Sequence, residues 1–383
     1  MDASAFAAQA DQAAAEGKLH EAERFLLQAV EASPGEIVLL LKLAGLQRAK
    51  GEAEAALRTV ERALAIEPRD FTALLLRASL LDRAGAGGAA VAWSHALAQR
   101  PPGAVPPHLA SVVAQAERRV EEWTAAREKV MVSATSAAEA AADEDERKRI
   151  ERFRSNRLRK TRHYHSEPTD FHYPGLRELE FHPRGRFPWI ERAEAQTKAL
   201  TEELHRVMSA ERAELVPYVH YDDHLPMEQW RPLNRSLDWT AIHLIKNGVT
   251  VEANARHCPR TMELLAALPQ PKISGSGPNA MFSLLAPNTQ IPPHVGVNNA
   301  RLVCHLPLVV PEGCWFRVGA ETRAWNVGEA FVFDDTIEHE AMNPTDELRV
   351  VFIFDVWHYD LSETEREAVA ALIGTETGGG GGL

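Results

Sequence analysis

The sequence predicts a multidomain α + β protein, in which an N-terminal α-helical solenoid precedes an antiparallel β-sandwich or jelly roll. Three observations support this: a 34-residue period across the first hundred residues, a polar and highly charged stretch after it, and short apolar runs divided by turn residues from about residue 165 onward. Such runs are typical of antiparallel sandwiches and jelly rolls. Strands and helices do not alternate along the second half, which argues against a doubly wound parallel sheet.

The first hundred residues keep one spacing at three kinds of position. The residues that recur every 34 positions are Gly17, Gly51 and Gly85, then Ala22, Ala56 and Ala90, and finally Pro34, Pro68 and Pro102. Glycine can end the first helix of a unit, the small alanine lets two helices approach closely, and proline stops the second helix. Residues 1–102 therefore resemble three tetratricopeptide repeats, which implies a groove for a peptide or protein partner.

The segment 103–164 separates these repeats from the predicted β-domain. GAVPPHLASVV breaks the repeat, and the residues after it are polar, mixed in charge and mostly helical in pattern. We interpret the segment as a helical cap and charged linker. Its basic run RKRIERFRSNRLRKTRH is explained more readily by a solvated helix face than by a binding site.

Composition narrows the class of protein. The 383 residues carry a net charge of −12, which argues against nucleic acid or an anionic membrane as the main partner. The N-terminus has no secretory signal pattern, and no stretch is apolar for long enough to span a bilayer. The cysteines Cys258, Cys304 and Cys314 are odd in number and lack metal-site spacing. We therefore expect a cytoplasmic protein without a disulfide framework or structural zinc.

Residues 165–362 are predicted to form the β-domain. Its beginning is rich in Pro, Gly and aromatic residues, which indicates ordered loops, and 191–210 is predicted to be one helix. Strands are predicted within 239–248, 279–288, 301–313, 314–321, 322–329, 330–335 and 348–358. The remaining residues, 363–383, are expected to be a helical end and a flexible glycine-rich tail.

Two histidines near strand ends are candidate metal ligands. His294 lies in PPHVG before the strand that starts at Arg301, and His339 follows the strand in FVFDD. Neutral imidazoles suit Fe(II), and two of them leave coordination positions open for a chelating co-substrate, oxygen and water. A purely structural role is the alternative, because histidines near strand ends are often not ligands.

Arg349 strengthens the metal interpretation. It lies in the last predicted strand, where an inward guanidinium could hold a dicarboxylate through two parallel hydrogen bonds. Burying it without an anion would be costly. The alternative is an ion pair with a nearby acid such as Asp346 or Glu347.

These motifs carry a resemblance. PPHVGVNNARLVCHLPLVVPEGCWFRVG, FVFDDTIEHE and FIFDVWH, within a region from DFHYPGL to DVWHYDL, resemble the aspartyl/asparaginyl β-hydroxylase family. The resemblance implies a double-stranded β-helix (a jelly-roll or cupin-like fold) whose iron is held by two histidines and no carboxylate. Gly296, two residues after His294, is then the expected residue. Animal members also place tetratricopeptide-like helices before this domain.

The resemblance assigns a ligand set and a pocket for the co-substrate 2-oxoglutarate. The implied iron ligands are His294 and His339. The implied pocket consists of Arg349 and Ser283 at the far carboxylate, His305 at the near end, Val303 and Cys304 on the same strand, and Trp239 as a wall. From chemistry alone, Ser283 is equally explained as a satisfied core hydroxyl and Trp239 as core filling.

The sequence departs from the animal members at several points. Val303 stands where they have an arginine, Asn288 replaces a glycine, and Cys258 has no partner for their disulfide. Asparagine tolerates a left-handed turn, so that exchange is mild. With no anchor predicted, the chain resembles a bacterial-type cytoplasmic member. Asp334 and Asp335 offer an alternative as metal ligands beside His339, but the resemblance makes them supporting or turn residues.

The expected function is that of an Fe(II)- and 2-oxoglutarate-dependent dioxygenase that uses O2. By resemblance, its target is the β-carbon of Asp or Asn in a peptide or protein recruited by the repeats, with Arg301 and Arg260 as candidates to receive a substrate carboxylate. Two alternatives remain open. The same chemistry could act on a lipid or small molecule, or the repeats could be the functional part beside a catalytically silent β-domain.

Overall fold

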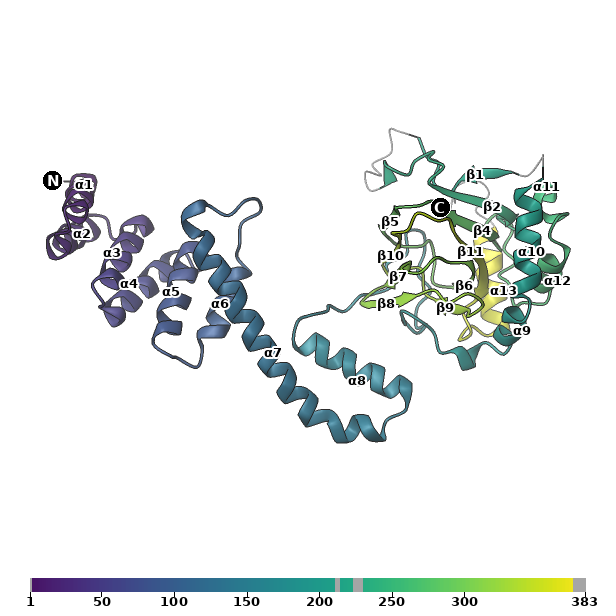
Figure 1. Cartoon of the computed structure of the whole chain (residues 1–383), viewed down its shortest axis with the longest axis horizontal. Coiled ribbons are helices and arrows are strands. Elements are labelled where there is room, and N and C mark those ends of the chain that lie inside the picture. Colours follow the sequence, from purple (N-terminus) through teal and green to yellow (C-terminus); the bar gives the residue numbers. More distant parts are fainter. Residues whose placement is uncertain (1, 211–213, 223–229, 375–383) are drawn as a thin grey trace. The chain divides into compact units, whose positions relative to one another are not determined.

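The computed structural model describes residues 2–210, 214–222 and 230–374. It divides into two compact units, Met1–Lys160 and Thr161–Leu383 (Figure 1). The second unit begins slightly before residue 165, because Tyr164 packs against its core and Arg162 pairs with Glu338 at 3.3 Å. The predicted glycine-rich tail lies outside the described residues. Within the described ranges, no helix combines the length and apolar character that a membrane crossing requires.

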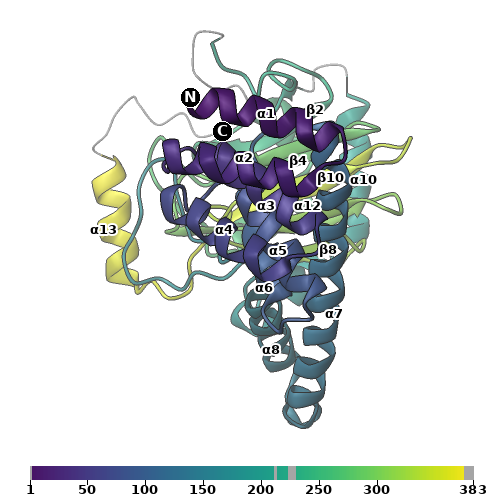
Figure 2. The ribbon, with the colours of Figure 1, turned by 90° about the vertical axis from the view of Figure 1, so that its left-hand side faces the viewer.

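The first unit contains three antiparallel helix pairs, as the 34-residue period predicts (Figure 1 and Figure 2). The pairs are α1 (Ala3–Ala15) with α2 (Leu19–Ala32), α3 (Ile37–Ala49) with α4 (Ala53–Ile66), and α5 (Phe71–Arg83) with α6 (Ala89–Leu97). Gly17, Gly51 and Gly85 follow the first helix of each pair with φ of 76°, 85° and 62°. This left-handed conformation favours glycine, which explains the conserved spacing within the chain.

A helical hairpin follows the repeats. After the short 3-10 helix η1 (Pro107–Leu109), the first turns of α7 (Ala110–Ala141) cap the solenoid, where Val113 and Ala116 pack against Trp93 of α6. Helix α8 (Glu144–Arg157) begins with a capping box formed by Asp143 and Glu146. The predicted cap and linker is therefore helical almost throughout.

The second unit contains two antiparallel sheets, as predicted for a jelly roll. In the described residues, the larger sheet has the order β1-β2-β4-β11-β6-β9, with β3 beside β2, and the smaller sheet has the order β5-β10-β7-β8. The strands are β1 (Leu215–Pro217), β2 (Trp239–Lys246), β3 (Val249–Thr250), β4 (Ala280–Leu285), β5 (Thr289–His294), β6 (Arg301–Val309), β7 (Trp315–Val318), β8 (Glu321–Ala324), β9 (Phe331–Phe333), β10 (His339–Asn343) and β11 (Arg349–Trp357).

Helices cover one face of the larger sheet (Figure 1). They are α9 (Ile190–Glu194), α10 (Thr197–Met208) and α12 (Pro259–Ala266). The 3-10 helix η2 (Arg184–Arg186) precedes α9, α11 (Glu252–Ala255) precedes α12, and α13 (Glu363–Gly374) follows the last strand. The prediction of one helix over 191–210 is wrong, because a turn at residues 195–196 separates α9 from α10. Thr197 Oγ1 donates to the backbone oxygen of Glu194 at 2.6 Å, and the Glu194 carboxylate accepts from the backbone N–H of Ala330 at 2.7 Å.

The opposite face of the larger sheet lies against the smaller sheet, and the two enclose a second core. Alternation along each strand decides which residues reach it, so Leu302 and Leu306 of β6 pack under the helices while Val303 lies between the sheets. Strands β5 and β10 were not predicted. Pro292 and Pro293 argue against a strand in the sequence. The strand β5 accommodates them because it lies at the edge of its sheet.

Candidate active site

Two strands that were not predicted, β5 and β10, carry the two candidate histidines. His294 ends β5, His339 begins β10, and the two residues are directly paired in the antiparallel ladder. Their ring centroids lie 3.9 Å apart at an interplanar angle of 55°. The smaller sheet therefore brings together two imidazoles that are 45 positions apart in the printed sequence.

Each imidazole is oriented by a backbone carbonyl two residues earlier. His294 Nδ1 lies 2.8 Å from the oxygen of Pro292, and His339 Nδ1 lies 3.0 Å from that of Ile337. Each Nδ1–H can donate there, which leaves the Nε2 lone pair for a ligand. Burial lowers the pKa of His339 to about 4 and that of His294 well below its usual value, so both rings are neutral at physiological pH.

Gly296 has no room for a side chain. A Cβ at this position would overlap the carboxylate of Asp335, whose backbone oxygen also accepts from the Gly296 N–H at 2.6 Å. An acid at position 296 is therefore excluded by this packing. In the described residues, no group of three or more histidine, cysteine or acidic side chains is arranged to hold a metal ion, so the pair of histidines stands without a carboxylate ligand.

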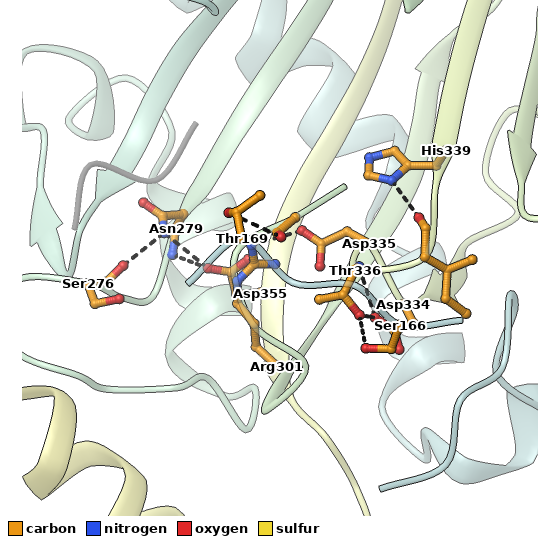
Figure 3. Close-up of polar contacts among 12 residues, drawn as sticks. Ser166, Thr169, Ser276, Asn279, Arg301, Asp334, Asp335, Thr336, His339 and Asp355 are labelled. Carbon is orange, nitrogen blue, oxygen red and sulfur yellow. Dashed lines mark hydrogen bonds and ion pairs between the residues drawn. The ribbon is translucent and has the colours of Figure 1, made fainter. Parts of the chain in front are cut away.

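The two neighbouring aspartates have different partners (Figure 3). Asp334 accepts from the backbone N–H of Thr336 at 3.0 Å and stabilises the turn before His339. Burial raises the pKa of Asp334 to about 7. Asp335 pairs with Arg301 at 2.9 Å, and its other oxygen, Oδ1, is buried without a hydrogen-bond partner in the described part of the chain.

Arg301 lies between two carboxylates, as Figure 3 shows. One guanidinium nitrogen is 2.9 Å from Asp335 and another is 3.3 Å from Asp355 of β11. Asp355 also accepts from the backbone N–H of Asn279 at 2.8 Å. The charge of this candidate substrate residue is therefore already matched by two acids. The other candidate, Arg260, pairs with Glu263 on the surface of α12 and lies outside the cavity described below.

Arg349, unlike Arg301, has no acidic partner among the described residues. Its side chain is 1% exposed, one guanidinium nitrogen lies 3.5 Å from the backbone oxygen of Ser283, and its Nε has no hydrogen-bond partner among the described residues. Its guanidinium lies 4.9 Å from the ring centroid of Trp325. Asp346 instead accepts from Asn288, and no ion pair joins Arg349 to any described acid. Burial lowers its pKa to about 10, so the buried group remains a cation.

Two indoles orient the polar groups around Arg349. Trp239 Nε1 donates to Ser283 Oγ at 3.1 Å, while Tyr218 stacks on the indole with ring centroids 3.8 Å apart. Trp325 Nε1 lies 3.3 Å from His305 Nδ1. Because indole can only donate, His305 Nδ1 accepts, and a neutral His305 carries its proton on Nε2. Burial lowers the pKa of His305 well below its usual value.

These groups line one cavity of about 620 Å³ between the two sheets. Of the predicted site residues, it brings together His294, His339, Arg349, Ser283, His305, Val303, Trp239 and Arg301. Cys304 requires a correction. Its side chain lies in the helix-covered core, because neighbouring residues of a strand face opposite sides. Asn288 adopts the left-handed conformation, with φ of 55°, as its exchange for glycine predicts.

Sequence reasoning missed several residues of this cavity. Asp355 is the second partner of Arg301, and a lone acid within the apolar run RVVFIFDVW was a signal that could have found it. His243 and Lys246 of β2 line the end of the cavity that also contains Asn279 and Asp355. No local sequence pattern indicated that Lys246 lines the cavity.

Comparison with known proteins supports the resemblance drawn from the motifs. A model of the aspartyl/asparaginyl beta-hydroxylase family matches residues 194–359. Human aspartate beta-hydroxylase domain-containing protein 2 is 39% identical over 135 residues, which cover 34% of this chain and 37% of that protein. Human aspartyl/asparaginyl beta-hydroxylase is 32% identical over 186 residues, covering 48% and 24%. The predicted resemblance of the second unit to this family is confirmed, although the chain spans well under half the length of either relative.

Among solved structures, the repeats are similar to the Sgt2 tetratricopeptide domain from Aspergillus fumigatus, with 21% identity over 31% of this chain and 80% of that one, at a TM-score of 0.28. The repeat architecture of the first unit rests on its own helix pairs rather than on this likeness.

Proposed function

We propose that the chain is an Fe(II)- and 2-oxoglutarate-dependent dioxygenase that hydroxylates the β-carbon of Asp or Asn in a peptide or protein. The observation that carries this proposal is a buried Arg349 without an acidic partner among the described residues, in the cavity that two neutral imidazoles, each held through its Nδ1, also line. A cation without a buried acid partner is costly unless a ligand supplies the anion. The similarity to beta-hydroxylases supports the same reaction class.

The histidine pair has the properties that a divalent iron site needs. Both rings are held by Nδ1–H bonds to backbone carbonyls, and burial keeps them unprotonated. Imidazole nitrogen suits Fe(II), and two protein ligands leave open positions for a bidentate co-substrate and oxygen. We infer that His294 and His339 would hold the metal.

The surroundings of Arg349 fit one end of a dicarboxylate. Its guanidinium can bind a carboxylate through charge-assisted hydrogen bonds, and the Ser283 hydroxyl can add a donor because it already accepts from Trp239. His305 offers an Nε2–H to an oxygen of the same molecule. Together these groups would orient 2-oxoglutarate with its far carboxylate at Arg349.

Bound iron would couple the oxidation of 2-oxoglutarate by O2, which yields succinate and carbon dioxide, to the insertion of the second oxygen atom into a substrate C–H bond. The protein would orient the reactants and exclude water from the site. Trp239, Tyr218 and Phe333 form apolar walls, which limit water around the reacting groups. Val303 adds an apolar wall where the animal enzymes have an arginine, so we expect His305 to hold its end of the co-substrate without a second guanidinium.

The proposed substrate is a protein rather than a free amino acid, because the helix pairs of the first unit provide a surface for extended peptides. This part can be tested by cross-linking the full chain to substrate proteins. We expect cross-links to Lys42 of α3, which is the one lysine within the helices α1 to α6. Cross-links confined to the second unit would contradict recruitment by the repeats.

The reaction is tested by succinate release from the full chain with Fe(II), 2-oxoglutarate and a library of Asp- and Asn-containing peptides, with mass spectrometry for addition of one oxygen atom. His339→Ala should abolish both signals and iron binding. The matched control is His205→Ala on the exposed side of α10, which should retain them. Absence of iron binding and of turnover in the unmodified protein would favour a silent binding module, and turnover with fatty acyl substrates alone would favour the lipid alternative.

A further inference from the structure

A β-bulge in β2 changes which side chains face the cavity. Up to His243 the strand alternates regularly, so Ile242 packs under the helices while Ala241 faces the other side. The register then shifts: His243 pairs with Met281, but Ile245 pairs with Ala280. Leu244 and Ile245 consequently both lie in the helix-covered core, and Lys246 returns to the cavity side. Strict alternation would have buried Lys246 instead.

The turn after the bulge is held in place by the side chain of Asn279. Asn279 Oδ1 accepts from the Asn247 N–H at 2.8 Å, and Asn279 Nδ2 lies 3.2 Å from Asp355, the partner of Arg301 (Figure 3). Gly248 has φ of 79°, and a Cβ there would lie 2.7 Å from the backbone oxygen of Gly277. The backbone position of Lys246 is thus set by the same network that surrounds Arg301, while its side chain is exposed.

Charge pairing singles out Lys246. Among the described residues that line the cavity, the lysines and arginines are Lys246, Arg301 and Arg349. Arg301 is matched by two carboxylates, and Arg349 lies with Ser283 and His305 at the co-substrate end. Lys246 is exposed and makes no hydrogen bond or ion pair with any described residue. Asp170 also lines the cavity, but it does not pair with Lys246 within 4 Å.

A second polar group beside Lys246 also has no partner. His243 precedes the bulge on the same face of β2, and its Nδ1 is buried without a hydrogen bond in the described structure. One exposed cation and one buried imidazole nitrogen, neither paired with a described residue, therefore lie at the end of the cavity away from Arg349. This combination suits an anionic group that arrives with the substrate.

We propose that Lys246 is a specificity-determining residue that binds an anionic side chain next to the residue being hydroxylated, with His243 as its neighbour. The ligand chemistry is a carboxylate or a phosphorylated hydroxyl on the substrate peptide. This inference rests on the proposed function, and it assigns substrate charge recognition to Lys246 rather than to Arg301. The enzyme should therefore prefer Asp or Asn targets that have an acidic neighbour.

The test uses the full chain and peptides that share one target residue but carry Glu, phosphoserine or Gln beside it. We expect KM for the Glu peptide to be about five- to tenfold lower than for the Gln peptide, and Lys246→Met to remove this difference while leaving kcat unchanged. Lys246→Arg should retain the preference and Lys246→Glu should reverse it. A larger gain for phosphoserine than for Glu would identify phosphate as the preferred group. The matched control, Lys198→Met on α10, should behave like the unmodified protein.

Binding of the same peptides, measured by fluorescence anisotropy, separates this inference from the proposed reaction. If the peptides bind with an acidic preference that Lys246→Met removes, but no turnover occurs, the reaction is wrong and the recognition stands. If turnover occurs with equal KM for the Glu and Gln peptides, and both bind Lys246→Met as tightly as the unmodified chain, the role of Lys246 is overturned.

Discussion

Arg301 and Arg349 both lie in the wall of one cavity, but their surroundings differ in charge. Arg301 lies between Asp335 and Asp355, whereas no described acid pairs with Arg349. A buried cation that is paired with carboxylates contributes to stability, because removing it leaves those carboxylates unpaired. An unmatched cation is maintained at a cost in folding free energy, which a ligand can offset. The contrast distinguishes a positioning role from a binding role within one pocket.

The contrast predicts opposite stability effects for two equivalent substitutions. Arg301→Met should lower the free energy of unfolding by about 3–5 kcal/mol, because it leaves two carboxylates buried without their partner. Arg349→Met, the matched control, should leave stability unchanged or higher because it removes an unneutralised charge. Urea unfolding of both variants provides the measurement. Equal losses of stability would contradict the distinction drawn between the two arginines.

The same pair should differ in catalysis. Arg349→Met should raise KM for 2-oxoglutarate about a hundredfold or more, because the buried anchor for the far carboxylate is lost. The measurement is succinate release against 2-oxoglutarate concentration, with peptide held saturating. An unchanged KM would show that the co-substrate is held elsewhere.

A smaller effect is expected for the hydroxyl that accompanies Arg349. Ser283→Ala should raise KM for 2-oxoglutarate about fivefold, because one donor to the carboxylate disappears and Trp239 Nε1 loses its acceptor. Ser283→Thr keeps the hydroxyl and should retain most of the affinity. Equal effects of the two changes would indicate that packing rather than the hydroxyl matters here.

The acid beside the Arg301 network makes a pH-dependent prediction. Because burial raises the pKa of Asp334 to about 7, the folded protein holds a proton on it that the unfolded chain releases near pH 4. Its contribution to stability is therefore present at low pH and is lost as pH rises toward 7. Asp334→Asn should remove this dependence and increase stability at pH 8 by on the order of 1 kcal/mol relative to the unmodified protein. Denaturation at pH 5 and pH 8 tests it, and an unchanged difference between the two pH values would contradict it.

Much of the fold could be predicted because it depends on local patterns. The glycine, alanine and proline spacing is sufficient to identify the helix pairs, and apolar runs bounded by turn residues identify β2, β4, β6 and β11. Strands β5 and β10 escaped prediction because most of their residues are polar or proline. Their strand conformation depends on pairing with each other, which no local pattern records.

For the candidate site, too, the residues marked by local sequence patterns could be predicted, whereas those that depend on strand pairing could not. His294, His339 and Arg349 could be identified because their chemistry is unusual for their positions. Cys304 could have been excluded by the alternation that relates Val303 to His305. The position of Lys246 on the cavity side of β2 could not be foreseen, because it follows from a register shift against β4.

The contact between Gly296 and Asp335 couples the residue types that can occupy these two positions, which are distant in the sequence. Any side chain introduced at residue 296 needs the volume that the Asp335 carboxylate occupies, and moving that carboxylate releases its hold on Arg301. A lineage that acquired an acid at the first position would therefore need a compensating change at the second. In related sequences, we expect residue types at these two positions to change together.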